Sequence, residues 1–196
     1  MPPKCKFAKE EIVSAALEIT RREGFQAVTA RAVSVRLNAS TKVIFSLFEN
    51  MEALLEAVIG AANQVYQETI RRAIDSGEYP PYKASGMAYI RFAQENKELF
   101  KLLFMRDRSQ ENVQENTEEM KPLVQIIQQN TGLPEAQAQM LHLEMWIYVH
   151  GIATMLATSY LEWDWKLIDK MLTDGYEGIA SRHIAKGNEK WTQSKQ

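Results

Sequence analysis

Residues 29–48, TARAVSVRLNASTKVIFSLF, contain the pattern that decides how this chain is expected to fold. Thr29 stands where a helix would begin, because its hydroxyl can accept a hydrogen bond from a free N–H group of the first turn. The pattern predicts a short helix over residues 30–37, followed by a tight turn. Ser40 is placed in the same way before a second short helix, over residues 41–47. Two short helices joined by a tight turn form a helix-turn-helix pattern.

The second helix is expected to bury one face and expose the other. By their spacing Ile44 and Phe48 point inward, whereas the outward positions are mostly small or polar. A recognition helix enters the major groove of DNA with its N-terminal residues leading, and there a lysine such as Lys42 can donate to guanine. The DNA-contact candidates in this helix are Ser40, Thr41, Lys42, Val43, Phe45 and Ser46. Those at the start of the preceding helix are Thr29, Ala30 and Arg31.

Helical patterns continue on both sides of this motif. Before it, apolar residues recur at helical spacing over residues 8–23, and Gly24 is placed to end that helix. After it, Asn50 is placed to cap a long helix. Further helices are predicted at roughly 82–95, 97–106, 114–130, 134–160 and 165–186. We expect an all-α protein with a three-helix domain over residues 1–50 and a larger helical bundle over residues 51–196.

Composition and charge agree with this expectation. The chain has 196 residues, of which 45% are hydrophobic and 24% charged, with only nine glycines and six prolines. These values are typical of a globular protein and favour helices. Residues 1–48 contain eight basic and four acidic residues, whereas the remainder contains fifteen and twenty-one. A basic head on an acidic body fits a protein that presents one end to a polyanion.

The N-terminal leader and the longest apolar stretch indicate a cytoplasmic protein. No apolar segment follows Lys4 and Lys6, so no signal peptide is expected, and the single Cys5 cannot form an internal disulfide. The stretch 145–157 is interrupted by polar residues and is shorter than the ~20 residues that span a bilayer. We expect no membrane partner.

Residues 7–58 resemble the DNA-binding domain of the TetR family of bacterial repressors. The residues that carry the resemblance are Ala15-Ala-Leu17, Gly24-Phe25, Thr29, Ala39-Ser40, Ile44, Phe45, Phe48 and Glu52-Ala-Leu-Leu55. The resemblance implies a homodimer that binds palindromic double-stranded operator DNA and is released by a small molecule. Three positions depart from the usual family pattern, because Phe45, Leu47 and Met51 stand where Tyr, His and Lys are common. Each of these departures removes a donor directed at a phosphate.

The C-terminal part resembles the effector domain of one TetR subgroup, named for a Trp-His-Gly signature. The resemblance lies in residues 89–104 and in Trp146-Ile-Tyr-Val-His150-Gly151. It implies a ligand-sensing and dimerising domain, and methionines with aromatic residues suit an apolar ligand. The effector-contact candidates are Phe92, Phe104, Met105, Trp146, Tyr148 and His150. A plain core role is the alternative for each of them, and His150 could equally be a hydrogen-bonded core histidine.

The last two predicted helices suggest a dimer interface. An apolar stripe on the last helix could pair with its copy and with the preceding helix, in a four-helix arrangement about a two-fold axis. The stripe consists of Ile168, Met171, Leu172, Gly175 and Ile179, and the facing residues are Gly151, Met155 and Tyr160.

Two other classes of function compete with a regulator. A helical metalloenzyme could use His142, Glu144, His150 or His183, but the first two are two residues apart and point to different faces of a helix. No metal, nucleotide or nucleophile motif is present in the sequence, so we expect no enzyme activity, metal or cofactor. A helical adaptor that binds a protein through its first three helices is the second rival. The basic head and the outward Lys42 argue against it.

Overall fold

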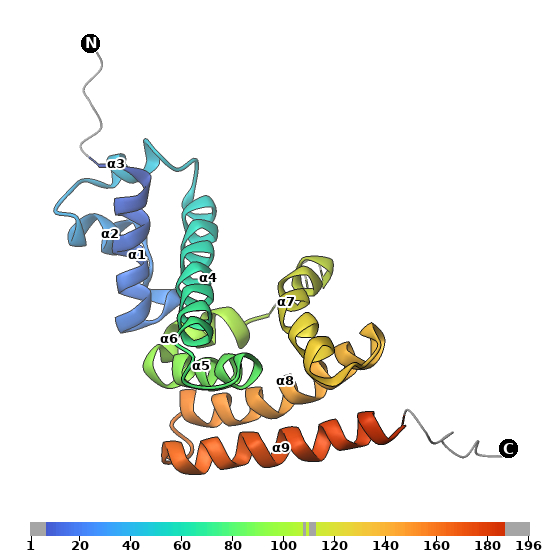
Figure 1. The fold of residues 1–196 in the computed structure, drawn as a ribbon. Helices are drawn as coiled ribbons and strands as arrows, with labels where there is room; N and C mark the ends of the chain where they lie inside the picture. The colour runs from blue at the N-terminus through green and yellow to red at the C-terminus, as the bar shows by residue number, and fades with distance from the viewer. Residues whose placement is uncertain (1–6, 108, 110–112, 187–196) are drawn as a thin grey trace, which may run out of the picture. The chain divides into compact units, whose positions relative to one another are not determined.

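A computed structural model describes residues 7–107, 109 and 113–186 of the chain. Every regular element in these residues is a helix, which confirms the predicted all-α class. Figure 1 shows the helices in order: α1 (Lys9–Glu23), η1 (Phe25–Ala27), α2 (Ala30–Arg36), α3 (Thr41–Phe45), α4 (Met51–Asp75), α5 (Pro81–Glu95), α6 (Lys97–Phe104), α7 (Val113–Thr131), α8 (Glu135–Ala157) and α9 (Trp165–Lys186).

Local capping explains where most of these helices begin and end. Gly24 ends α1 with φ at +86°, a region that a side chain would disfavour, and its N–H donates to the carbonyl of Thr20 at 3.0 Å. The helix predicted to continue to residue 160 ends at Ala157, because Ser159 adopts a left-handed conformation with φ at +56°. The other predicted boundaries agree with the structure to within two or three residues.

The helices form two compact units, which we call unit 1 and unit 2. Unit 1 contains the chain up to Thr69 together with Phe92–Asp107, and unit 2 contains Ile70–Arg91 together with the chain from Arg108 onward. Unit 1 is therefore larger than the domain that we predicted over residues 1–50. The reason is that Leu54 and Val58 of α4 are completely buried in the same core as α1, α2 and α3. Where the DNA-binding function ends along the chain stays a prediction.

The core of unit 1 is built from one apolar face of each short helix. Ile12 and Ala16 of α1, Val33 of α2 and Ile44 of α3 are all at most 1% exposed. They lie at the positions that helical periodicity predicted to be inward. Since these helices are short, this shared core supplies most of the stability that each of them lacks alone.

The helix α6 also belongs to unit 1, although it lies far along the chain. It packs on α1 and η1, and its Leu99 and Phe100 are completely buried. A carboxylate oxygen of Glu98 lies 3.1 Å from the point where Gly24 would carry a Cβ atom. A side chain at Gly24 would therefore press on Glu98 as well as strain the backbone.

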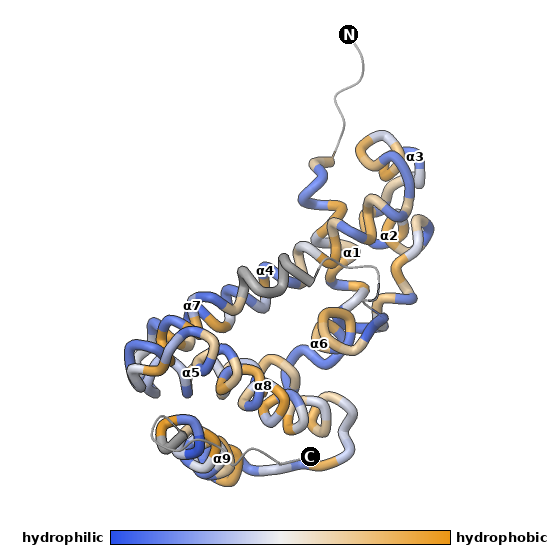
Figure 2. Tube along the Cα trace, turned by 90° about the vertical axis from the view of Figure 1, so that its right-hand side faces the viewer, coloured by the Kyte–Doolittle hydropathy of each residue, from blue (hydrophilic) through white to orange (hydrophobic). Residues whose placement is uncertain are grey.

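In unit 2 the helix α8 is the central element and packs against α7 and α9. Its inward face is mainly apolar, with Leu141, Met145, Val149, Ile152 and Leu156 buried, and His142 is a buried polar side chain among them. Figure 2 shows that hydrophobic (orange) and hydrophilic (blue) positions alternate along the helices, as expected for helices with one buried face. None of the helices in the described residues has the length and apolar character that crossing a membrane requires.

Two tyrosine–histidine hydrogen bonds connect α5 to α8. The Tyr82 hydroxyl lies 3.0 Å from Nδ1 of His142, and the Tyr89 hydroxyl lies 2.8 Å from Nδ1 of His150. Between them Gly86 allows close approach, because a Cβ there would lie 3.1 Å from a methyl group of Leu172 on α9. The two imidazoles therefore take part in packing inside unit 2.

Burial changes the pKa values of the two histidines and of Tyr82. Removal from water lowers the pKa of His142 and of His150 below the ordinary value of 6.5. Burial, and secondarily the nearby Tyr176, raise the pKa of Tyr82, so this hydroxyl stays protonated and can donate to the neutral imidazole of His142. Nearby, the Lys83 ammonium pairs with the Asp169 carboxylate at 2.7 Å, and Nε2 of His183 lies 2.7 Å from a carboxylate oxygen of Glu144.

Acidification should therefore weaken the folded state through these two histidines. With a lowered pKa, the folded chain binds fewer protons than the unfolded chain, so the free energy of unfolding should fall as the pH drops through 6.5. It should continue to fall until the lowered pKa values are passed. Asparagine keeps an acceptor near the position of Nδ1 but does not titrate. We measure the free energy of unfolding with denaturant at about pH 7.5 and about pH 5.5. Between these two pH values, a His142→Asn, His150→Asn double variant should lose less of its free energy of unfolding than the wild type. An equal loss in both proteins would contradict this account.

Candidate nucleic-acid interface

The turn between α2 and α3 is formed as the sequence predicted. The Thr29 hydroxyl accepts a hydrogen bond from the Ala32 N–H at 3.1 Å, which confirms its role as the cap of α2. Asn38 adopts φ of +48°, which asparagine tolerates better than most residues, and Ala39 then donates to the carbonyl of Ser34 at 2.9 Å. These bonds fix the direction in which α3 leaves the turn.

The helix α3 exposes the side chains that the pattern placed outward. Thr41, Lys42 and Ser46 are exposed, and Phe45 is 48% exposed, whereas Ile44 on the opposite face is only 1% exposed. Val43 is half-buried and packs against the core of unit 1. The surface of α3 is therefore a small polar patch around one exposed aromatic ring.

Ser40 differs from the sequence expectation. It occupies the N-cap position of α3 with extended backbone angles, but its hydroxyl makes no capping hydrogen bond. The predicted capping role of this side chain is therefore wrong. The first turn of α3 is held instead through its backbone, where the Val43 N–H donates to the Ser40 carbonyl at 3.1 Å.

The three positions that depart from the usual family pattern behave differently from one another. Leu47 and Met51 are half-buried and pack against the core of unit 1, whereas Phe45 points away from it. Next to them Asn50 caps α4 as predicted, because its side-chain oxygen accepts from the Ala53 N–H at 2.8 Å. That N–H is no longer available to a phosphate.

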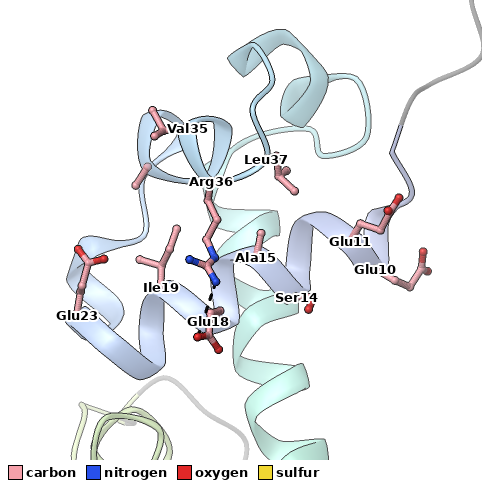
Figure 3. Close-up of a pocket in the computed structure, with 11 residues that line it drawn as sticks. Glu10, Glu11, Ser14, Ala15, Glu18, Ile19, Glu23, Val35, Arg36 and Leu37 are labelled. Carbon is pink, nitrogen blue, oxygen red and sulfur yellow. Dashed lines mark ion pairs between the residues drawn. The ribbon is translucent and has the colours of Figure 1, made fainter.

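A groove between α1 and α2 lies on another face of unit 1. Figure 3 shows Glu10, Glu11, Glu18 and Glu23 around it, with Arg36 reaching across to Glu18 at 3.8 Å. Four carboxylates and one paired guanidinium make this face acidic. A polyanion would be repelled from it.

The residues predicted to touch an effector are divided between the two units. Phe92 and Phe104 of unit 1 both pack edge-on against Tyr66, with ring centroids 5.4 and 5.1 Å apart, and Phe92 is completely buried. Met105, which also belongs to unit 1, is 42% exposed.

In unit 2 the predicted effector residues include one well-defined cluster. The Trp146 ring stacks on His150 with centroids 5.1 Å apart and an angle of 18°, and His150 in turn bonds to Tyr89. Tyr148 instead packs against Gly175 of α9. Sequence reasoning did not single out Tyr89 or Tyr82, because nothing in the spacing of α5 indicates which histidine each would meet.

The residues considered as metal ligands do not form a cluster. They are His142, Glu144, His150 and His183. His142 and His150 each bond to a tyrosine of α5, and His183 bonds to Glu144 at 2.7 Å. Within the described ranges, no three His, Cys, Asp or Glu side chains come together in a way that could hold a metal ion.

Comparison with known families matches both parts of the chain. Residues 12–58 match the profile described as bacterial regulatory proteins, tetR family. Residues 82–174 match the profile described as tetracyclin repressor-like, C-terminal domain. No curated protein matches the sequence.

Solved structures share the fold at low sequence identity. A TetR-like transcriptional regulator from Rhodococcus sp. RHA1 aligns with a TM-score of 0.64 and 15% identity, over 90% of this chain and 95% of its own. A protein of unknown function from the same organism aligns with a TM-score of 0.68 and 20% identity, over 93% of this chain and 98% of its own. These similarities extend over both units.

Proposed function

Because this chain belongs to the TetR family of transcriptional regulators, we propose that it is a repressor that binds near-palindromic operator DNA as a homodimer and is released by a small apolar molecule. The observation that carries the proposal is the exposed face of α3. Thr41, Lys42 and Phe45 project from a helix whose opposite side is anchored in the core through Ile44. Such a helix can enter a major groove without disturbing the fold that presents it. The proposal implies a cytoplasmic protein.

Within this proposal, some residues of the helix-turn-helix contact bases and others contact phosphates. Thr41 and Lys42 lie in the first turn of α3, where base edges are nearest to a recognition helix. Lys42 donates to guanine, and the methyl group of Thr41 suits a thymine methyl. Arg31 and Thr29, at the start of α2, are exposed and suit phosphates, which fix the register of the protein on DNA. Ser40, whose hydroxyl is not used as a cap, can donate there as well.

The proposed dimer uses an apolar face of α8 that shares only Met155 with the interface that the sequence suggested. Ile168 and Leu172 of the predicted stripe are at most 3% exposed and pack inside the chain, so they do not form an interface. The apolar residues that remain exposed at helical spacing on α8 are Met140 (49%), Leu143 (44%), Ile147 (59%) and Met155 (37%). An exposed apolar stripe of this kind favours association with a second copy.

The proposed effector site lies beside the cluster of Trp146 and His150. Trp146 is 40% exposed and flat against the imidazole, so an apolar ring can reach the indole from solvent. The tyrosine on the other side of His150 supplies a polar group for orientation. Phe92, Phe104 and Met105 stay candidates on the basis of the sequence alone.

The first test is selection of DNA from a pool of random duplexes by the purified protein. We expect a near-palindromic site with half-sites about one helical turn apart, ~34–36 Å. Lys42→Ala should then lose roughly 1–3 kcal/mol of discrimination between the selected duplex and a scrambled one, as measured by fluorescence anisotropy. Lys166→Ala, at an exposed lysine of α9, is the matched control and should bind like the wild type. Equal affinity of the wild type for every duplex would refute the proposed function.

The dimer face is tested by placing a charge on it. Ile147→Arg should yield monomers in sedimentation, because a guanidinium buried without a partner costs several kcal/mol. The fold of the subunit should survive, since Ile147 is 59% exposed within it. Val35→Arg, at a 72% exposed apolar residue of α2, is the control and should remain dimeric. A dimer of Ile147→Arg as tight as that of the wild type would place the interface elsewhere.

The effector is tested by titrating hydrophobic compounds against the complex of the protein with its selected duplex. A compound that lowers DNA affinity tenfold must bind the DNA-free state more tightly by about 1.4 kcal/mol, and DNA must weaken its binding by the same factor. We expect Trp146→Ala to lose this response, whereas Trp163→Ala, in the segment between α8 and α9, should keep it. Compounds that release DNA equally well from Trp146→Ala would show that the site is elsewhere.

A further inference from the structure

The beginning of α1 lies at the same end of unit 1 as α3, as both ribbon and tube show (Figures 1 and 2). Lys9 is the first residue of α1, and its Nζ lies 5.2 Å from the centroid of the Phe48 ring. Phe48 follows α3 by three residues and is only 6% exposed, so the core holds its ring in place. The ring attracts the ammonium through its negative face and positions it beside α3.

The ammonium of Lys9 is exposed to solvent. In the part of the chain that the structure describes, Lys9 forms no ion pair. In contrast, Arg22 and Arg36 of the same unit both approach the Glu18 carboxylate, at 2.7 and 3.8 Å. Lys9 therefore presents an ammonium that has no salt-bridge partner among the described residues, at the end of unit 1 where α3 lies.

The carboxylates next to Lys9 in the sequence are directed elsewhere. Glu10 and Glu11 line the groove between α1 and α2 (Figure 3). The Glu11 carboxylate also accepts a hydrogen bond from the Ala8 N–H at 2.8 Å, which fixes it at the start of its own helix. Because neighbouring residues of a helix point to different faces, the lysine and the two glutamates belong to different surfaces of unit 1.

We infer that Lys9 binds a DNA phosphate beside the recognition helix, with the Phe48 ring holding its ammonium in position. The inference rests on the proposed DNA-binding function and adds to it a residue outside the helix-turn-helix. An ammonium has three N–H donors, so contact with a ring leaves donors for phosphate oxygens. The ring also restricts the side chain before DNA arrives, which lowers the entropy lost on binding. This cation lies near the corner of α3 and α4, where Phe45, Leu47 and Met51 supply no donor.

The test is the salt dependence of binding to the selected duplex and to a scrambled duplex. Each lost phosphate contact lowers the slope of log affinity against log salt by about 0.9, so Lys9→Gln should lower it by about 1.8 for a dimer. Over a fourfold rise in salt, the variant should lose about tenfold less affinity than the wild type. The weakening should be equal on both duplexes, because a phosphate carries no sequence information. Lys9→Arg, which keeps the charge and can still stack on the ring, should restore the wild-type slope.

The matched control is Arg21→Gln, which removes one exposed positive charge from the other end of α1. It should leave the slope unchanged, and both variants should melt like the wild type because both side chains are exposed. A Lys9→Gln slope equal to that of the wild type would overturn the role of Lys9 while leaving the proposed function intact. A loss confined to the selected duplex would also overturn it, since that result indicates a base contact. A wild-type protein that selects no duplex would instead refute the proposed function itself.

Discussion

Burial of Ile44 is the constraint on which the rest of this structure depends. The helix α3 has only five residues, Thr41–Phe45, and helices shorter than roughly 12–15 residues are marginal in water. It persists because Ile44, at 1% exposure, is packed into a core that α1, α2 and α4 also share. The side chains that α3 exposes are therefore held by the inward packing of Ile44, with Val43 partly buried beside it, and by the turn that precedes the helix. This short helix has little stability of its own.

The packing of α6 on α1 connects a distant part of the chain to the core that holds α3. The helix α6 begins at Lys97, well beyond the helix-turn-helix in sequence, yet its Leu99 and Phe100 are buried in unit 1. The contact of Glu98 with Gly24 lies where α1 ends and η1 begins. A change that displaced α6 would have to disturb the packing of α1, and α1 shares its core with α3. Such a disturbance would reach the surface of α3, because packed cores adopt discrete arrangements and do not deform continuously.

The sequence predicted the helix-turn-helix region more completely than it predicted the surroundings of the histidines in unit 2. The outward positions of α3 and the caps at Thr29 and Asn50 agree with the structure, because capping and helical periodicity are local rules. The cap at Ser40 was wrong, and the residue types alone could not reveal it, since serine is equally suited to capping and to leaving its hydroxyl exposed. The partners of His142 and His150 were not foreseeable either. They come from α5, more than fifty residues earlier in the chain.

The sequence by itself determined the helical class, the order of the helices and the family to which the chain belongs. Those properties depend on short-range spacing, on caps and on motifs, all of which are readable along one segment. Only the tertiary structure decided which apolar stripe is used inside the chain. Ile168 and Leu172 proved to be internal, whereas Leu143 and Ile147 on α8 remain exposed. An apolar stripe specifies that a helix face must be buried, but not what buries it, because the hydrophobic effect has no direction.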